Sequence, residues 1–113
     1  IALASGYGMR IHPIYKVKKM HTGIDFAAAI GTPIYATADG VIDKVEVSFS
    51  GYGKMLEIDH GFGYRTRYAH MHGFAVRQGQ KIKRGDLIGY VGDTGLSTAP
   101  HLHYEVFVNG IHA

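Results

Sequence analysis

The sequence predicts a mostly β fold, a curved antiparallel β-sheet or two packed sheets with an open groove, long connecting loops and little helix. Valine, isoleucine, tyrosine and phenylalanine recur at every second position in several short stretches, and almost no stretch repeats with the 3.6-residue helical period. The 113 residues also include 16 glycines, about twice the average share, and these interrupt the alternating stretches at turn-like positions. We therefore expect short strands joined by many turns.

The first half of the chain contains one clear strand pattern. Residues 1–20 are irregular and predict a loop that wraps the sheet. Residues 41–47 predict a half-buried strand in which Val41, Val45 and Val47 face the same way, with one irregularity at Asp43.

The second half of the chain predicts most of the sheet. Residues 54–60 and 64–70 flank a glycine-containing turn and predict an antiparallel hairpin. Two shorter strands, over residues 81–83 and 87–91, are separated by a turn. Residues 102–108 predict a last strand that ends at an Asn-Gly dipeptide, which is a strong turn signal.

Composition limits the function classes. Hydrophobic residues make up 46% of the chain and charged residues 19%, so residues 1–113 predict a single folded domain. Because the chain starts with Ile1, we expect a fragment or mature form of a longer precursor. The net charge of +3 comes from dispersed basic residues without a recognised motif, which argues against nucleic acid. The longest apolar run, residues 26–30, is too short for a membrane span.

Eight histidines are the one compositional anomaly, and histidine is both a common metal ligand and the usual acid or base near neutral pH. In a strand, His101 and His103 share one face while Leu102 points to the other, and Glu105 shares the face of His103. This pattern is typical of a metal or acid-base site, although two solvent-facing histidines would give it too.

Two further patterns leave similar alternatives open. His21 and Asp25 are four residues apart, and a backbone bend at Gly23 would let them bind one metal ion; the alternative is an exposed turn histidine with a capping aspartate. His70 ends a predicted strand, where a histidine is either an edge residue or part of a site. Together the three patterns supply the histidines and carboxylate that a zinc hydrolase needs.

The sequence resembles the lysostaphin-type or LytM-type zinc metallopeptidases, which cut the peptide part of peptidoglycan, and is nearer to their Gram-negative branch. The resemblance runs along most of the chain, through the segments Arg10–Pro13, His21–Asp25, Gly31–Ala36, Gly51–Gly53, His60–Tyr64, Tyr68–His70, Gly79–Gly85, Ile88–Gly92 and Pro100–Glu105.

The resemblance implies that His21, Asp25 and His103 bind one zinc ion and that water occupies the fourth position. It implies catalytic positions for His70 and His101, without saying which of them does what. The expected function is zinc-dependent hydrolysis of peptide bonds in peptidoglycan cross-links or stem peptides by metal-activated water, outside the cytoplasm. An inhibitory or regulatory segment outside this chain would also fit the resemblance.

Two other functions compete with this interpretation. A non-catalytic module of the same fold would bind the cell wall or activate an amidase, but relatives of that kind lack ligands, and here the set is complete. A swinging-arm carrier would present a modified lysine, with Lys54 as the candidate because Met55 follows it. The carrier reading leaves the histidine patterns unexplained.

Overall fold

The computed structural model describes residues 17–20, 23–49, 51–95 and 99–112, and the regular structure in these ranges is entirely β-strand. The strands in chain order are β1 (Val17–Met20), β2 (Gly23–Ala27), β3 (Pro33–Tyr35), β4 (Gly40–Val47), β5 (Lys54–Gly61), β6 (Tyr64–Ala69), β7 (Met71–Phe74), β8 (Lys81–Ile82), β9 (Leu87–Val91), β10 (His101–Val108) and β11 (Ile111–His112). The mostly β fold expected from the sequence is confirmed.

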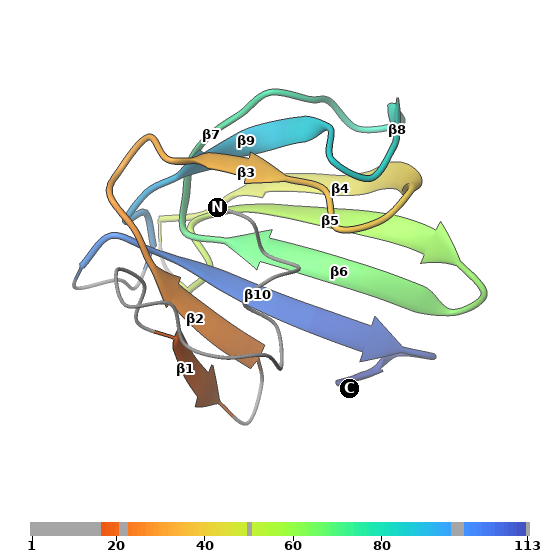
Figure 1. The fold of residues 1–113 in the computed structure, drawn as a ribbon, viewed down its shortest axis with the longest axis horizontal. Helices are drawn as coiled ribbons and strands as arrows, with labels where there is room; N and C mark the ends of the chain where they lie inside the picture. The colour runs from red at the N-terminus through yellow and green to blue at the C-terminus, as the bar shows by residue number, and fades with distance from the viewer. Residues whose placement is uncertain (1–16, 21–22, 50, 96–98, 113) are drawn as a thin grey trace.

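Two antiparallel sheets lie face to face (Figure 1). The larger sheet has the order β1-β2-β10-β6-β5-β4-β8, with β11 paired to β10, and the smaller sheet has the order β3-β9-β7. The predicted hairpin is formed by β5 and β6. Strand β10 lies between β2 and β6, so it joins residues from both halves of the chain on one surface.

The core fills the space between the sheets. Tyr104 of β10 lies opposite Ile24 of β2 and Tyr68 of β6, and all three side chains are buried. Ile34 and Ile88 of the smaller sheet belong to the same cluster. Since successive residues of a strand point to opposite faces, His103 and Glu105 must lie on the outer face of the larger sheet.

Two sequence expectations need correction. Residues 17–20 form β1, although the segment was expected to be a loop. In β4 the expected irregularity at Asp43 is present, because the register shifts between Ile42 and Lys44. The expected inward face is wrong, however, since Ile42 is buried while Val41 and Val47 are exposed. A bulge at this position changes the direction of the side chains that follow it.

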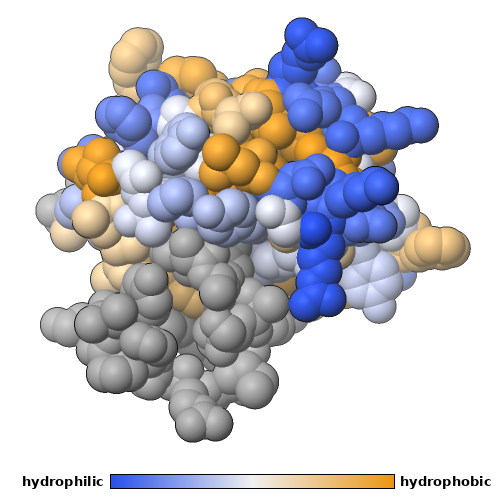
Figure 2. Space-filling view, turned by 45° about the horizontal axis from the view of Figure 1, so that its top comes forward, coloured by the Kyte–Doolittle hydropathy of each residue, from blue (hydrophilic) through white to orange (hydrophobic). Residues whose placement is uncertain are grey.

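Strands β2, β3 and β7 were not recognised from alternation in the sequence. These strands are only three to five residues long, too short for a clear alternating pattern. They form because they pair with strands that are distant in the sequence. The face drawn in Figure 2 carries a hydrophobic area beside a group of hydrophilic side chains. Within the described ranges, no helix has the length and apolar character needed to cross a membrane.

Candidate active site

The larger sheet brings four of the five predicted site residues together. Asp25 on β2 and His103 on β10 are direct cross-strand partners. His101 precedes His103 by two residues on β10, and His70 directly follows β6, whose last residue pairs with His103. The fifth predicted residue, His21, lies outside the described residues.

His103 is held between two carboxylates. Its Nδ1 lies 2.6 Å from Oδ1 of Asp25, and its Nε2 lies 2.9 Å from Oε2 of Glu105. Because an ionised carboxylate only accepts hydrogen bonds, both ring nitrogens donate in this arrangement. Burial lowers the pKa of His103, but the hydrogen bonds to Glu105 and Asp25 outweigh it and raise the pKa overall.

His70 is fixed by main-chain groups. Its Nδ1 lies 2.6 Å from the carbonyl oxygen of Thr94, and its backbone nitrogen donates to the carbonyl of Tyr52 at 2.8 Å. Burial lowers the pKa of His70, so the neutral ring is favoured. With the proton of the neutral ring on Nδ1, Nε2 is the atom that can accept a proton.

His101 completes a group of three neighbouring imidazoles. Its Nδ1 lies 2.9 Å from the carbonyl of Ala99, while its Nε2 is 3.8 Å from Oδ1 of Asp25. The ring centroid of His70 is 4.7 Å from that of His101 and 6.2 Å from that of His103. The three rings and the Asp25 carboxylate therefore converge on one small region.

A row of charged residues continues from this region across the outer face. Glu57, Arg67 and Glu105 are cross-strand partners on β5, β6 and β10. The guanidinium of Arg67 lies 2.8 Å from a carboxylate oxygen of each glutamate. Burial raises the pKa of Glu105, but the hydrogen bond from His103 and the charge of Arg67 outweigh it and lower the pKa overall.

No sequence pattern pointed to a role for Arg67 or Thr94, and Tyr52 was expected either to pack or to line a groove, not to contact Glu105. For Glu105 a signal was available, because it shares the strand face of His103 two residues away. The contacts of the other three depend on pairings between distant segments, such as Arg67 opposite Glu105, that no local pattern reports.

The donor types present suit a borderline metal such as zinc, which binds imidazole nitrogen and carboxylate oxygen. Nδ1 of His103 and Oδ1 of Asp25 already lie side by side. In the part of the chain that the structure describes, no group of three His, Cys, Asp or Glu residues is arranged to hold a metal ion. The third predicted ligand, His21, is not in that part.

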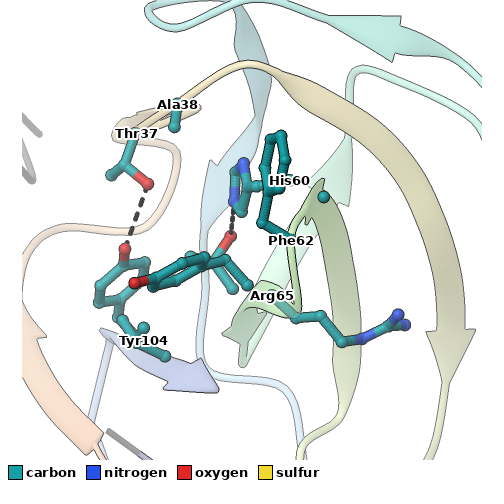
Figure 3. Close-up of a pocket in the computed structure, with 10 residues that line it drawn as sticks. Thr37, Ala38, His60, Phe62, Arg65 and Tyr104 are labelled. Carbon is teal, nitrogen blue, oxygen red and sulfur yellow. Dashed lines mark hydrogen bonds between the residues drawn. The ribbon is translucent and has the colours of Figure 1, made fainter. Parts of the chain in front are cut away.

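A pocket of about 550 Å³ lies on the other face of the larger sheet (Figure 3). Tyr104 lines it, with its hydroxyl 3.1 Å from Oγ1 of Thr37. His60 also lines it, and its ring nitrogens contact the carbonyl of Asp39 and the hydroxyl of Thr66 at 2.7 and 2.8 Å. Asp25, His70, His101 and His103, the predicted site residues that the structure describes, are not among its lining residues, so the pocket is separate from the imidazole group.

The model of peptidase family M23 matches residues 19–113, which is most of the chain. The chain belongs to peptidase family M23. This membership confirms the resemblance on which the assignment of the site residues depends.

Two bacterial relatives are similar over nearly the whole chain. DD-carboxypeptidase/endopeptidase Mpg of Neisseria meningitidis serogroup B is 48% identical over 108 residues, which is 96% of this chain and 25% of the relative. Peptidoglycan DD-endopeptidase ShyA of Vibrio cholerae is 46% identical over 101 residues, which is 89% of this chain and 23% of the relative. The chain thus spans about a quarter of these relatives.

Solved structures share the fold. A zinc-containing peptidase from Vibrio cholerae has a TM-score of 0.82 at 35% identity, over 91% of this chain and 36% of that one. The catalytic domain of lysostaphin from Staphylococcus simulans has a TM-score of 0.75 at 41% identity, over 80% of this chain and 68% of that one. The two-sheet architecture of this M23 chain is therefore that of known peptidases.

Proposed function

We propose that this chain is a zinc-dependent endopeptidase domain that hydrolyses peptide bonds in peptidoglycan cross-links or stem peptides. In this proposal His21, Asp25 and His103 bind one zinc ion, and His70 and His101 assist the reaction. The observation that carries it is the convergence of the Asp25 carboxylate and the His103 imidazole beside two more imidazoles, in a chain of family M23.

The described side chains fit a zinc ion in type, and two of them already lie side by side. Nδ1 of His103 and Oδ1 of Asp25 are 2.6 Å apart, and these are the two atoms that would hold the ion. His103 would lose its Nδ1 proton on binding the metal. Its Nε2 would keep its proton and would still donate it to Glu105 in a hydrogen bond. A zinc-containing peptidase is also among the structures with this fold.

The two other histidines suit proton transfer. Bound zinc would supply an activated water nucleophile and would polarise the scissile carbonyl. His70, kept neutral by burial, accepts a proton at Nε2 because Nδ1 is already donated to Thr94. His101 is anchored through Nδ1 on the carbonyl of Ala99, so it would donate from Nε2 to the developing charge or to the leaving amine when both of its ring nitrogens carry a proton.

The relatives support a substrate and a location for this domain. Relatives named as DD-endopeptidases support a D,D cross-link as the substrate of this domain. Since peptidoglycan lies outside the cytoplasm, we place the action of this domain in the periplasm, in the cell envelope or outside the cell. The chain would form one catalytic domain, residues 1–113, of a longer protein, whose other segments would include any inhibitory or regulatory part.

Zinc content and wall cleavage, measured together, test this function. We expect about one zinc per chain by elemental analysis and chelator-sensitive release of muropeptides from purified sacculi. His103→Ala should lose both, whereas His72→Asn, which removes an exposed histidine, should keep both. Activity that survives in His103→Ala would contradict the proposal. One zinc with wall binding but no cleavage would favour a non-catalytic module.

A further inference from the structure

Glu105 is a buried carboxylate whose two oxygens both have partners, and the Tyr52 hydroxyl is within hydrogen-bond distance of each. Its side chain has no exposed surface. Oε2 accepts from Nε2 of His103 at 2.9 Å and from the hydroxyl of Tyr52 at 3.1 Å. Oε1 accepts from Nη1 of Arg67 at 2.8 Å. The direction of the carboxylate is therefore determined from both sides.

Arg67 is itself fixed on several sides. Its Nε and Nη2 both lie 2.8 Å from Oε2 of Glu57. Its guanidinium carbon lies 4.8 Å from the ring centroid of Tyr52 and 4.7 Å from that of Phe107. A planar guanidinium that is paired and stacked in this way has little freedom to turn. It can thus hold Glu105 in one orientation.

The way in which His103 is anchored differs from that of the other two imidazoles. His70 and His101 are held through Nδ1 by main-chain carbonyls, whereas His103 is held through Nε2 by Glu105. An imidazole has two nitrogens, and the hydrogen bond at one determines which is left to face a ligand. Glu105 thereby directs Nδ1 of His103 to the side of Asp25.

We propose that Glu105 is a positioning residue for the metal ligand His103, and that Arg67 keeps Glu105 in place. Neither touches the reacting atoms. The inference rests on the proposed function, in which His103 binds zinc. Partners of this kind typically change metal affinity by about 10- to 100-fold when they are removed.

The test compares variants of the chain. Glu105→Gln keeps the size of the side chain but replaces one acceptor oxygen by an NH₂ group. This NH₂ group would face a donor, either Nε2 of His103 or Nη1 of Arg67, so one of the two hydrogen bonds is lost. Arg67→Met frees Glu105 without altering the carboxylate. Asp43→Asn is the matched control, because Asp43 is an exposed partner of Arg65 further along the same sheet face.

Zinc affinity of the metal-free chain, measured by competition with a chromophoric chelator, is the first readout. We expect Glu105→Gln to weaken zinc binding by about 10- to 100-fold. Arg67→Met should weaken it in the same direction, and Asp43→Asn should leave it unchanged. The second readout is the Nε2 proton of His103 in the zinc-loaded chain, seen by ¹⁵N-edited NMR. It should exchange slowly in the wild type and faster in both variants.

The outcomes separate this inference from the function on which it rests. Wild-type zinc affinity and an unchanged Nε2 proton in both Glu105→Gln and Arg67→Met would overturn the positioning role alone. A wild-type chain that binds no zinc would overturn the proposed function and the positioning role with it. A purely structural role would lower the melting temperature of the metal-free variants without changing zinc affinity, and would likewise contradict the proposal.

Discussion

Gly53 and Gly95 approach each other so closely that a Cβ atom added to Gly53 would lie 2.5 Å from the backbone nitrogen of Gly95. Both glycines have positive φ values, of 65° and 76°. The same added Cβ would lie 2.5 Å from the carbonyl oxygen of Thr94, which is the acceptor for Nδ1 of His70. The contact between the two loops thus determines where the His70 ring is anchored.

Gly53→Ala should therefore impair catalysis while sparing metal binding. The new methyl group must displace the Thr94 carbonyl that anchors His70, and misplacement of a catalytic group by about 1 Å can cost on the order of 100-fold in rate. Zinc affinity should stay near that of the wild type, because His70 is not a proposed ligand. Steady-state cleavage of a cross-linked muropeptide and zinc titration would measure the two effects.

Gly51→Ala is the control for backbone strain. Gly51 also has a positive φ, of 62°, but an added Cβ would have no neighbour within 4 Å. We expect this variant to lose about 1–2 kcal/mol of stability from the left-handed conformation alone and to keep its rate of cleavage. Equal loss of activity in both variants would show that the close contact with Thr94 is not what matters.

The strand pattern around the histidines was readable from the sequence because β10 alternates strictly. Leu102 and Tyr104 are buried in the core, and His103 lies on the opposite face, as expected. The same reasoning failed in β4, where the bulge at Asp43 put Ile42 rather than Val41 and Val47 inside. Alternation predicts faces only where no residue is inserted into the ladder.

The candidate ligands and catalytic histidines of the site could also be predicted from the sequence. The residues that hold them in place could not. Sequence patterns pointed to Asp25, His70, His101 and His103, which the fold brings together, and to His21, which lies outside the described residues. The anchor of His70 on Thr94 spans 24 residues and the contact between Arg67 and Glu105 spans 38. Such contacts depend on sheet order and register, which a single sequence does not specify.

The pKa of His70 should lie below its usual value of about 6.5, because burial disfavours the charged ring. The ring then stays neutral to lower pH and can still accept a proton there, so protonation of His70 should reduce cleavage only below pH 6.5. The unfolded chain takes up the proton first, so the contribution of His70 to stability falls as the pH drops through 6.5. NMR titration of the His70 ring would measure this, and a midpoint above 6.5 would contradict it.

His101→Gln should separate catalysis from metal binding in a second way. His101 lies next to Asp25 but is proposed to act on the substrate, so its loss should reduce kcat by about 10²- to 10⁴-fold, the usual contribution of a general acid or base. The zinc content of the variant should stay at about one per chain. Elemental analysis and cleavage assays on the same preparation would decide, and a variant without zinc would make His101 a ligand instead.

Zinc should stabilise the folded chain, because two of its proposed ligands, Asp25 and His103, come from different strands and meet only after folding. At a free zinc concentration about 1,000 times the dissociation constant, the expected stabilisation is about 4 kcal/mol. For a domain of this size that corresponds to a rise in melting temperature of roughly 10–20 °C. Thermal unfolding followed by circular dichroism, with a chelator and then with added zinc, would measure it.

Magnesium should not replace zinc in this experiment, because it prefers six oxygen ligands. His103→Ala should melt at the same temperature with or without zinc, and a zinc-dependent shift in that variant would mean that the metal binds elsewhere.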